Sequence, residues 1–455
     1  MSLTRRRLLQ AAGATGLLSA CSQWRLAPAR PGEDFHLVAE PATLSIVPGH
    51  PSAGLAFNGG FPAPVLRVPQ GRPVRIRFSN RMDQPTTIHW HGIRLANAMD
   101  GVPGLTQPPV LPGEEFIYEF TCPDAGTFWY HPHMHSVEQL GKGLTGTLIV
   151  EENNPPDFDG EVILQLRDWR LAGDGSWLPL SIPRQAFRMG TLGTVQTVNG
   201  ELLPDIPVPA NGRLRLRLLN LDNTRVYGLS LGDTPARVLA VDGSPVAQPY
   251  PLTVHDTGAG MRLDLELIAA GEIGSTITVY DQQGLIRRPL ATLRIARSGI
   301  TAPRPPGPAL PANPLPPLDL DRALRDAFVF EWVGALSPAG AEGHNFWTIN
   351  RRSWNDHSHS DLPAPLAVWQ RGRTYVVELY NATPHPHPIH LHGEIFHVLS
   401  SSQRTITPWQ TDTVLLQKNE RVQIALVADN PGRWMFHCHV IEHMVTGLMG
   451  YVVIT

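Results

Sequence analysis

The stretch Gly71-Arg-Pro-Val-Arg-Ile-Arg-Phe-Ser-Asn80 recurs twice further along the chain in related form. The second copy is Gly212-Arg-Leu-Arg-Leu-Arg-Leu-Leu-Asn220, one residue shorter, and the third is Gly372-Arg-Thr-Tyr-Val-Val-Glu-Leu-Tyr-Asn381. In each copy apolar and polar residues alternate with a period of two, which indicates a half-buried β-strand. Three copies separated by long intervals predict three related β-domains, arranged as tandem sandwiches rather than as a solenoid.

Proline-marked breaks indicate where these domains end. Asn153-Asn-Pro-Pro156 interrupts the chain after the first copy of the repeat, and residues 301–317 are dense in proline, which is typical of an extended linker. We therefore predict domains at residues 35–152, 160–300 and 318–455. One large barrel with insertions would explain neither the repeat nor the linker.

The composition of the 455 residues favours an all-β protein and excludes several functions. Hydrophobic residues make up 42% and charged residues only 17%, with 41 glycines and 44 prolines. The net charge is −3 and no basic stripe is interleaved with aromatic residues, so we expect no nucleic-acid partner. The two lysines, Lys142 and Lys418, lie in no motif, which argues against Schiff-base chemistry. Three cysteines supply neither a disulfide framework nor a four-thiolate iron–sulfur site.

Residues 1–34 are expected to be an export signal and a short lead. Arg5, Arg6 and Arg7 precede a mildly apolar run that ends at Ala20, a pattern that resembles a twin-arginine signal. We therefore expect a periplasmic protein. Leu18-Ser-Ala-Cys21 also matches a lipoprotein cleavage box that would anchor Cys21 to lipid; the alternative is an ordinary signal-peptidase site. The apolar run is too short for a transmembrane segment.

Histidine is the abundant reactive residue, and ten of the 19 histidines form four compact clusters. These are His89 and His91; His131 and His133; His387, His390 and His392; and His437, His439 and His443. Nine residues beyond Asn80 and beyond Asn381 the chain has a His-x-His pair, whereas the same offset beyond Asn220 reaches Leu229-Ser-Leu231. The middle domain is therefore expected to be a spacer or a substrate wall, with a metal site shared between domains 1 and 3.

The segment His437-Cys438-His439 predicts that two metal centres are joined by one strand. In a strand the two imidazoles face one side and the intervening thiolate faces the other. A thiolate with two imidazoles and a weak axial group is the blue-copper arrangement, for which His387 and His443 are the natural additional ligands. The eight remaining histidines match a cluster of three coppers. A lone His-x-His pair is usually an ordinary core or surface pair, and a structural zinc site closes at four ligands.

At these motifs the sequence resembles the three-domain bacterial multicopper oxidases, a group that contains laccases and copper-efflux oxidases. The matching segments are His89-Trp-His-Gly92, Trp129-Tyr-His-Pro-His133, His387-Pro-Ile-His-Leu-His-Gly393 and His437-Cys-His-Val-Ile-Glu-His443. The resemblance implies three cupredoxin-like Greek-key β-sandwich domains and four copper ions. It also implies oxidation of a donor in four one-electron steps, with dioxygen reduced to two waters and electrons entering at His443.

The same resemblance assigns the individual ligands. The type 1 copper would take His387, Cys438 and His443, and the type 2 copper would take His89 and His390. One type 3 copper would take His91, His131 and His439, and the other would take His133, His392 and His437. Exchanging domains 1 and 3 interchanges the two type 3 sets and preserves the type 2 pair.

Several residues at the edge of these motifs are expected to tune the site. Leu448 lies ten residues after Cys438, at the axial type 1 position, and Met449 is the alternative one residue on. Asp100 lies where related oxidases keep an acid near the three-copper cluster; the alternative is a plain turn residue. Met444 stands where some relatives have a glutamate, which leaves the proton relay on that side open. Asp412 is expected either to orient a ligand imidazole or only to end a strand.

The favoured function is a laccase-like oxidation of phenols or aromatic amines, with a small-molecule or metal-ion donor and O2 as partners of a monomeric protein. The alternatives are an oxidase of Mn(II), Cu(I) or Fe(II), a copper store, and a non-catalytic envelope scaffold. Only nine methionines occur and they are scattered, which argues against dedicated Cu(I) oxidation because thioethers recruit that ion. A scaffold relative would have lost ligands, and a store would not need the opposed Cys438.

Overall fold

The three repeated segments form equivalent central strands in a computed structural model that describes residues 26, 29–333, 345–354 and 362–455. These strands are β4 (Pro73–Asn80), β12 (Arg213–Asn220) and β23 (Thr374–Asn381). Each lies between a parallel neighbour and an antiparallel neighbour. The sequence repeat is therefore also a repeat of sheet topology.

The asparagine that ends each copy explains why the repeat extends that far. Asn80, Asn220 and Asn381 are fully buried. Each side-chain oxygen accepts a hydrogen bond from the backbone N–H two residues on, at 3.0–3.1 Å. Each side-chain amide donates to a carbonyl four or five residues on and to a second carbonyl across the turn. Asparagine offers a donor and an acceptor at one position, so it fixes the turn that leads to the next strand.

The first sandwich consists of two four-stranded sheets. Its remaining strands are β1 (Phe35–Val47), β2 (His50–Phe57), β3 (Leu66–Pro69), β5 (His89–His91), β6 (Glu115–Thr121), β7 (Gly126–His131) and β8 (Gly146–Glu151). The sheet orders are β2-β1-β4-β6 and β3-β8-β7-β5.

The second sandwich has sheets of six and five strands. Its remaining strands are β9 (Gly160–Trp169), β10 (Val195–Val198), β11 (Asp205–Pro209), β13 (Tyr227–Ser230), β14 (Ala236–Val241), β15 (Ser244–Pro251), β16 (His255–Thr257), β17 (Arg262–Ile268), β18 (Thr276–Asp281) and β19 (Arg288–Ala296). The orders are β10-β9-β12-β17-β14-β15 and β11-β19-β18-β13-β16.

The third sandwich also has sheets of six and five strands. Its remaining strands are β20 (Leu324–Trp332), β21 (Trp347–Ile349), β22 (Ala367–Trp369), β24 (His387–Leu391), β25 (Phe396–Ser401), β26 (Trp409–Thr411), β27 (Thr413–Leu416), β28 (Arg421–Val427), β29 (Gly432–Cys438) and β30 (Met449–Ile454). The orders are β21-β20-β23-β28-β25-β26 and β22-β30-β29-β24-β27. The predicted all-β, cupredoxin-like sandwich fold is confirmed, and the exact domain boundaries stay predictions.

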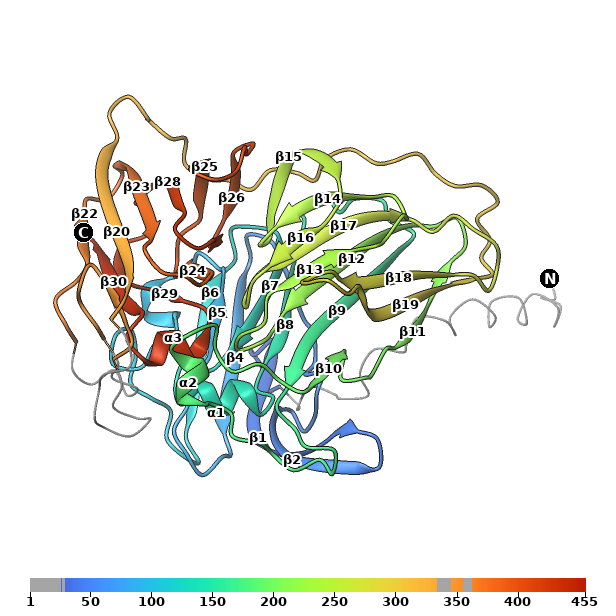
Figure 1. The fold of residues 1–455 in the computed structure, drawn as a ribbon, viewed down its shortest axis with the longest axis horizontal. Coiled ribbons are helices and arrows are strands. Elements are labelled where there is room, and N and C mark those ends of the chain that lie inside the picture. The colour runs from blue at the N-terminus through green and yellow to red at the C-terminus, as the bar shows by residue number, and fades with distance from the viewer. Residues whose placement is uncertain (1–25, 27–28, 334–344, 355–361) are drawn as a thin grey trace.

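Short helices gather near the junction of the sandwiches, where Figure 1 shows α1, α2 and α3 close together. They are α1 (Ser136–Gly141), α2 (Pro183–Ala186) and α3 (Ile441–Val445), and a 3-10 turn, η1, spans Asn97–Met99. The largest buried apolar cluster includes residues of the first and third sandwiches together, whereas the second sandwich has its own core. Sandwiches 1 and 3 thus share an interior at their junction.

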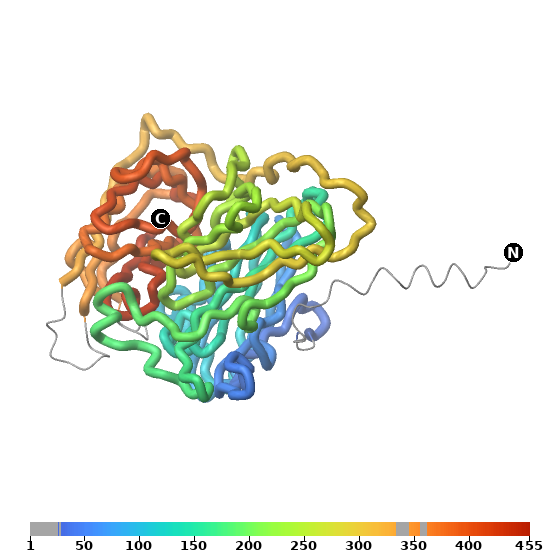
Figure 2. The backbone as a smooth tube through the Cα atoms, turned by 45° about the vertical axis from the view of Figure 1, so that its right-hand side comes forward, coloured from blue at the N-terminus to red at the C-terminus, as the bar shows by residue number. Residues whose placement is uncertain are grey.

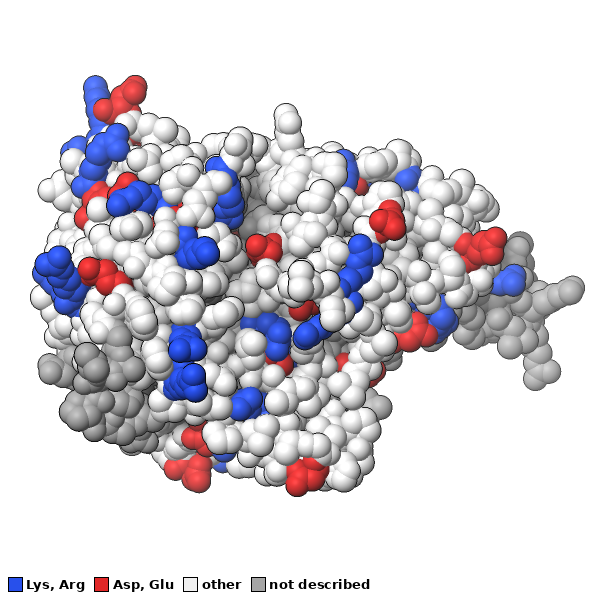
Figure 3. All heavy atoms as spheres, in the orientation of Figure 1, with Lys and Arg blue, Asp and Glu red and all other residues white. Residues whose placement is uncertain are grey.

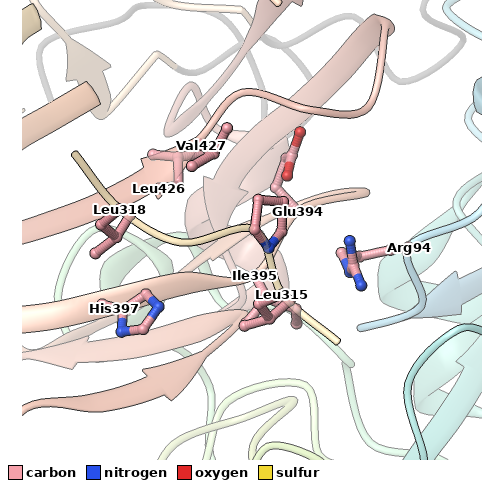
Figure 4. Close-up of a pocket in the computed structure, with 9 residues that line it drawn as sticks. Arg94, Leu315, Leu318, Glu394, Ile395, His397, Leu426 and Val427 are labelled. Atoms are coloured by element: carbon pink, nitrogen blue, oxygen red, sulfur yellow. The ribbon is translucent and has the colours of Figure 1, made fainter. Parts of the chain in front are cut away.

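The proline-rich segment 301–317 contains no helix or strand and follows the outer edge of the second sandwich in Figures 1 and 2. Arg94 holds its far end, because its guanidinium donates to the Pro314 carbonyl at 3.2 Å and pairs with Asp124 at 2.7 Å. Next to this anchor is a small pocket between the linker and the third sandwich, and its lining includes Arg94, Glu394 and His397 (Figure 4). Burial raises the pKa of Glu394 to about 8. None of the predicted copper ligands lines this pocket.

Positive and negative side chains are interspersed over the face drawn in Figure 3. Within the described ranges, no helix is both long enough and apolar enough to cross a membrane. The export signal predicted at residues 1–34, with Cys21, falls almost entirely outside the described residues.

A buried polar network ties the second sandwich to its neighbours. The Asp222 carboxylate accepts hydrogen bonds from Tyr227 Oη at 2.7 Å and from the Asp168 backbone N–H. Arg167 donates to the carbonyls of Leu221, Leu140 and Gly141, the last two in α1. The neighbouring Asn223 carbonyl accepts from the Ile441 N–H of α3. The turn after β12 therefore supports both helices.

The Asp222→Asn variant is expected to change how stability depends on pH. Burial, then the nearby Asp168 carboxylate, raises the pKa of Asp222 from 3.8 to about 7, against the opposing charges of Arg167 and Arg225. The folded protein therefore binds more protons than the unfolded chain between these values, so stability falls as pH rises from about 4 to 7. The effect is at most about 4 kcal/mol. Asparagine cannot ionise and removes this dependence.

Denaturant midpoints of both proteins at pH 5 and pH 8 test this prediction. We expect the variant to gain stability relative to wild type on going from pH 5 to pH 8. A constant difference between the two proteins at both pH values would contradict it.

Candidate metal centre

The predicted ligands converge because the strands that carry them are paired. In the first sandwich β5 and β7 place His89 opposite His131, and in the third β24 and β29 place His390 opposite His437. All four strands are buried along most or all of their length. The ten histidines and Cys438 are at most 1% exposed. Ligand strands of two sandwiches thus meet in the interior that these sandwiches share.

The structure brings the predicted ligands into compact groups with donor atoms within 4.8 Å of one another. One group joins the thiolate to two imidazoles: His387, Cys438 and His443. Two groups match the predicted type 3 sets: His91, His131 and His439; and His133, His392 and His437. A further group contains both predicted type 2 ligands: His89, His91 and His390. Among the described residues none of these groups draws on the second sandwich.

The histidine groups are related by an approximate twofold exchange of sandwiches 1 and 3. The rings of His89 and His392 stack with centroids 3.8 Å apart, and the rings of His91 and His390 stack at the same distance. Exchanging the sandwiches converts one stack into the other. The symmetry expected from the sequence is present in the geometry.

Two aspartates obey the same symmetry. The Asp100 carbonyl accepts from His89 Nδ1 and its carboxylate from His392 Nδ1, both at 2.9 Å. The Asp412 carbonyl accepts from His390 Nδ1 at 2.9 Å and its carboxylate from His91 Nε2 at 3.1 Å. Each aspartate therefore holds one histidine from each sandwich. Asp100 also lies directly after η1, at a turn. It is therefore both a turn residue and an acid beside the clustered histidines, so the two interpretations of this residue are compatible.

These hydrogen bonds fix which ring nitrogen faces the centre. Nδ1 of His89, of His131 and of His390 donates to a backbone carbonyl. Their Nε2 atoms are buried and have no hydrogen-bond partner among the described residues. His91 is reversed, because Nε2 donates to Asp412 and Nδ1 is left buried without a partner. Buried polar nitrogens without partners at converging positions fit a group of metal ions.

The electrostatics of the site also fit metal ligands. Burial, followed by the neighbouring histidines and, for His91, by Arg262, lowers the pKa values of His91, His131 and His439 well below their usual range, so these imidazoles are neutral. Neutral imidazole is the form that binds metal. Burial raises the pKa of the Cys438 thiol, so a thiolate there needs a bound cation to stabilise it.

The group formed by His387, Cys438 and His443 is compact. Nδ1 of His387 and Nδ1 of His443 each lie 3.5 Å from Cys438 Sγ and 3.0 Å from each other. His387 Nε2 lies 2.8 Å from Thr383 Oγ1, which orients that ring. Burial lowers the pKa of His387 to about 3. Soft sulfur with two imidazoles at this geometry suits copper.

Leu448, just before β30, and Met449, the first residue of β30, belong to different buried apolar clusters. Cys438 donates its N–H to the Leu448 carbonyl at 3.0 Å, and both residues belong to one buried apolar cluster. Met449 pairs with His437 in the β29–β30 register and belongs to a different cluster with Met435 and Met444. Of the two candidates, Leu448 therefore shares the environment of the thiolate. Met444 is buried in the apolar cluster of Met449.

The structure also adds residues that the sequence did not indicate. Glu442, which precedes His443, is 1% exposed and accepts hydrogen bonds from Thr191 Oγ1 at 2.8 Å and from the Thr191 N–H. Burial raises the pKa of Glu442, against hydrogen bonds from Ser181 and Thr191. These bonds hold residues 181–191 of the second sandwich against α3, with the Arg188 backbone beside His443. No motif marks this contact, because its partners are about 250 residues apart.

Comparison with known proteins agrees with this geometry. Two family models described as multicopper oxidase match residues 39–155 and 336–455. The chain is 43% identical to the multi-copper oxidase of Pseudomonas thermotolerans in a crystal structure, with a TM-score of 0.86, over 92% of this chain and 98% of that one. It is 27% identical to multicopper oxidase MmcO of Mycobacterium tuberculosis, over 96% of this chain and 90% of that protein. It is 26% identical to Laccase-1 of Cryptococcus neoformans var. grubii, over 92% of this chain and 82% of that protein. The chain therefore belongs to the multicopper oxidase family of oxidoreductases.

Proposed function

We propose that the protein binds four copper ions and oxidises a donor at the expense of dioxygen, which is reduced to two waters. His387, Cys438 and His443 would hold the type 1 copper, and Leu448 would fill its axial position. The other eight histidines would hold the three-copper cluster, divided as the family resemblance implies. The observation that carries this proposal is the cysteine-containing group beside the symmetric histidine groups.

Copper, when bound, would supply reversible one-electron transfer and the reduction of dioxygen. The chain supplies the connection between the two centres, because Cys438 is bonded through the backbone to His437 and His439 on the other side. It also excludes water, since all eleven ligands are buried. Asp100 is the proposed proton-carrying residue, because its carboxylate is buried next to His89 and His392 and has no arginine or lysine partner within the described ranges.

A small aromatic molecule is the donor class we favour. One of the relatives above is named a laccase, and its chain aligns over most of this one. Met189 is the only methionine exposed among the described residues, at 54%, and it lies in the segment 181–191 that covers His443. A single thioether is a poor recruiter of Cu(I), so a dedicated cuprous oxidase is disfavoured. An oxidase of Mn(II) or Fe(II) remains the second candidate.

Donor comparison tests this proposal. The copper-loaded protein is expected to be blue and to consume oxygen with guaiacol as the donor. Steady-state kcat/KM is then compared for guaiacol, Mn(II), Fe(II) and Cu(I). A higher value for a metal ion would replace the laccase-like assignment, and a colourless, oxygen-inert holoprotein would refute the oxidase itself.

Replacing Leu448 with methionine is expected to lower the reduction potential of the type 1 copper. A thioether at the axial position adds a weak ligand that favours the oxidised ion. A tenfold gain in the relative stability of that ion lowers a one-electron potential by about 59 mV. The two side chains are similar in volume, so the fold should tolerate the change. Redox titration of the blue band measures the shift.

Met449→Leu is the matched control for this variant. Met449 belongs to a different buried apolar cluster from Cys438, so we expect no change in potential. A shift in the control, with none in Leu448→Met, would assign the axial position to Met449.

Export to the periplasm by the twin-arginine pathway is also proposed, and it rests on residues 1–34 alone. Replacing Arg6 and Arg7 with lysine should leave the precursor uncleaved in the cytoplasm. Mass spectrometry of the mature amino terminus distinguishes a lipidated Cys21 from an ordinary cleavage.

A further inference from the structure

Arg262 is the first residue of β17 in the second sandwich, and its side chain is completely buried. This side chain extends from the second sandwich, which supplies none of the predicted copper ligands, toward the ligands of the other two. Its Nη1 donates to Asp412 Oδ1 at 2.9 Å and its Nη2 donates to Asp412 Oδ2 at 2.6 Å. This is a two-point pairing of guanidinium with carboxylate, the geometry in which arginine fixes the orientation of its partner most firmly. It joins the second sandwich to the third at 150 residues of separation.

The remaining donors of Arg262 are also used. Nε donates to the Thr127 carbonyl of the first sandwich at 3.1 Å, and Nη2 donates to the Asp242 carbonyl of the second at 2.9 Å. The guanidinium carbon lies 5.6 Å from the ring centre of Phe128. One side chain therefore contacts all three sandwiches, so the pair with Asp412 has a fixed position.

Asp412, which Arg262 holds in place, hydrogen-bonds directly to two predicted copper ligands. Asp412 Oδ1 accepts from His91 Nε2 at 3.1 Å, which leaves His91 Nδ1 facing the centre. The Asp412 carbonyl orients His390. Burial alone would raise the pKa of Asp412, but the charge of Arg262 holds it well below its usual range. The symmetry-related Asp100 has no such cationic partner among the described residues, so the second sandwich distinguishes the two halves of the site.

The glycine of the His-Trp-His-Gly motif is explained by the same pair. Gly92 has φ +84°, and a Cβ atom at that position would overlap both the Asp412 carboxylate and the Arg262 guanidinium. Gly260, two residues before Arg262, would in the same way overlap the His439 ring if it carried a Cβ atom. The backbone of the second sandwich is therefore packed against the ligands at van der Waals distance.

We propose that Arg262 is a positioning residue for the three-copper cluster and that the second sandwich is a working part of the copper site. It contributes no ligand among the described residues, but its arginine fixes Asp412, whose carboxylate orients His91 and whose backbone carbonyl orients His390. This inference rests on the proposed copper function. It replaces the expectation that the middle domain is only a spacer or a substrate wall.

The test compares Arg262→Gln and Arg262→Lys with wild type after dialysis of the holoprotein against a copper chelator. Gln removes the charge, and Lys keeps the charge but cannot pair at two points. We expect copper to be lost from the three-copper cluster at ~10–100-fold lower chelator concentration, as for other residues that orient metal ligands. The order of loss should be Gln, then Lys, then wild type. Atomic absorption gives copper per protein, and electron paramagnetic resonance reports the type 2 ion.

The blue band is the internal control, because the hydrogen bonds of Arg262 go to Thr127, Gly260, Asp412 and Asp242 and to none of the three residues of the cysteine group. It should persist in both variants while cluster copper is lost. Arg215→Lys is the matched control, since Arg215 is also buried in the second sandwich and pairs with Asp264 at 2.7 Å. It should retain copper as wild type does.

Two results would overturn the inference. Equal copper retention in wild type and both Arg262 variants shows that Arg262 does not position the site. Equal loss in Arg262→Lys and Arg215→Lys shows a general loss of stability instead. If Arg262→Gln does not fold, the Lys comparison decides. A wild-type protein that binds no copper would refute the proposed function, which is a different outcome.

Discussion

Replacing Cys438 with serine is expected to abolish the blue colour and to reduce donor oxidation to the level of free copper in buffer. The thiolate is the only sulfur ligand in the group with His387 and His443, and a serine hydroxyl is neither soft nor ionised at neutral pH. In the variant, residue 438 would no longer be a copper ligand. The covalent path from the type 1 copper to His437 and His439 would therefore be interrupted. Visible absorption and oxygen consumption with guaiacol measure both effects.

Cys122→Ser provides the matched control for this prediction. Cys122 is also buried, and burial raises the pKa of its thiol to about 12. It belongs to no metal-binding group among the described residues. Both variants replace a buried thiol with a hydroxyl, and an unpaired hydroxyl in the apolar surroundings of Cys122 costs about 1–3 kcal/mol, so Cys122→Ser controls for the effect of the substitution on stability. A blue Cys438→Ser protein, or a colourless Cys122→Ser protein, would contradict the type 1 assignment.

Asp100→Asn is expected to reduce oxygen consumption by ~10²–10⁴-fold, the usual contribution of a positioned acid or base. The asparagine oxygen can still accept from His392 Nδ1, so the copper content should be retained. What the variant loses is a group that exchanges protons beside the cluster, where dioxygen reduction consumes them. The measurement combines steady-state oxygen uptake with copper per protein by atomic absorption.

Asp124→Asn is the control, because Asp124 is a buried carboxylate paired with Arg94 and is not part of any ligand group. It should leave oxygen uptake unchanged. If Asp100→Asn lost copper together with activity, Asp100 would be a structural support like Asp412. Full activity with full copper would show that protons arrive by another path.

The strand pattern and the ligand clusters could be read from the sequence because both depend on local spacing. Alternation over Gly71–Asn80 and its two copies predicted equivalent strands, and these are β4, β12 and β23. His-x-His spacing on a strand indicated which histidines share a side, and the lack of a His-x-His pair nine residues beyond Asn220 predicted a middle domain without ligands. The same periodicity placed Cys438 opposite its two neighbouring histidines.

The contacts that hold and distinguish these ligands were decided only by how the sandwiches pack. Asp412 meets His91 across 321 positions, Arg262 meets Asp412 across 150, and Thr191 meets Glu442 across 251. No period or motif links such pairs, because their proximity depends on the orientation of whole sheets. The sequence by itself thus determined three β-sandwiches and predicted a set of candidate copper ligands shared by the first and the third. The tertiary structure decided that the second sandwich supplies the arginine that fixes one side of that site, since only the packing of the sandwiches brings the buried Arg262 guanidinium within reach of the buried Asp412 carboxylate.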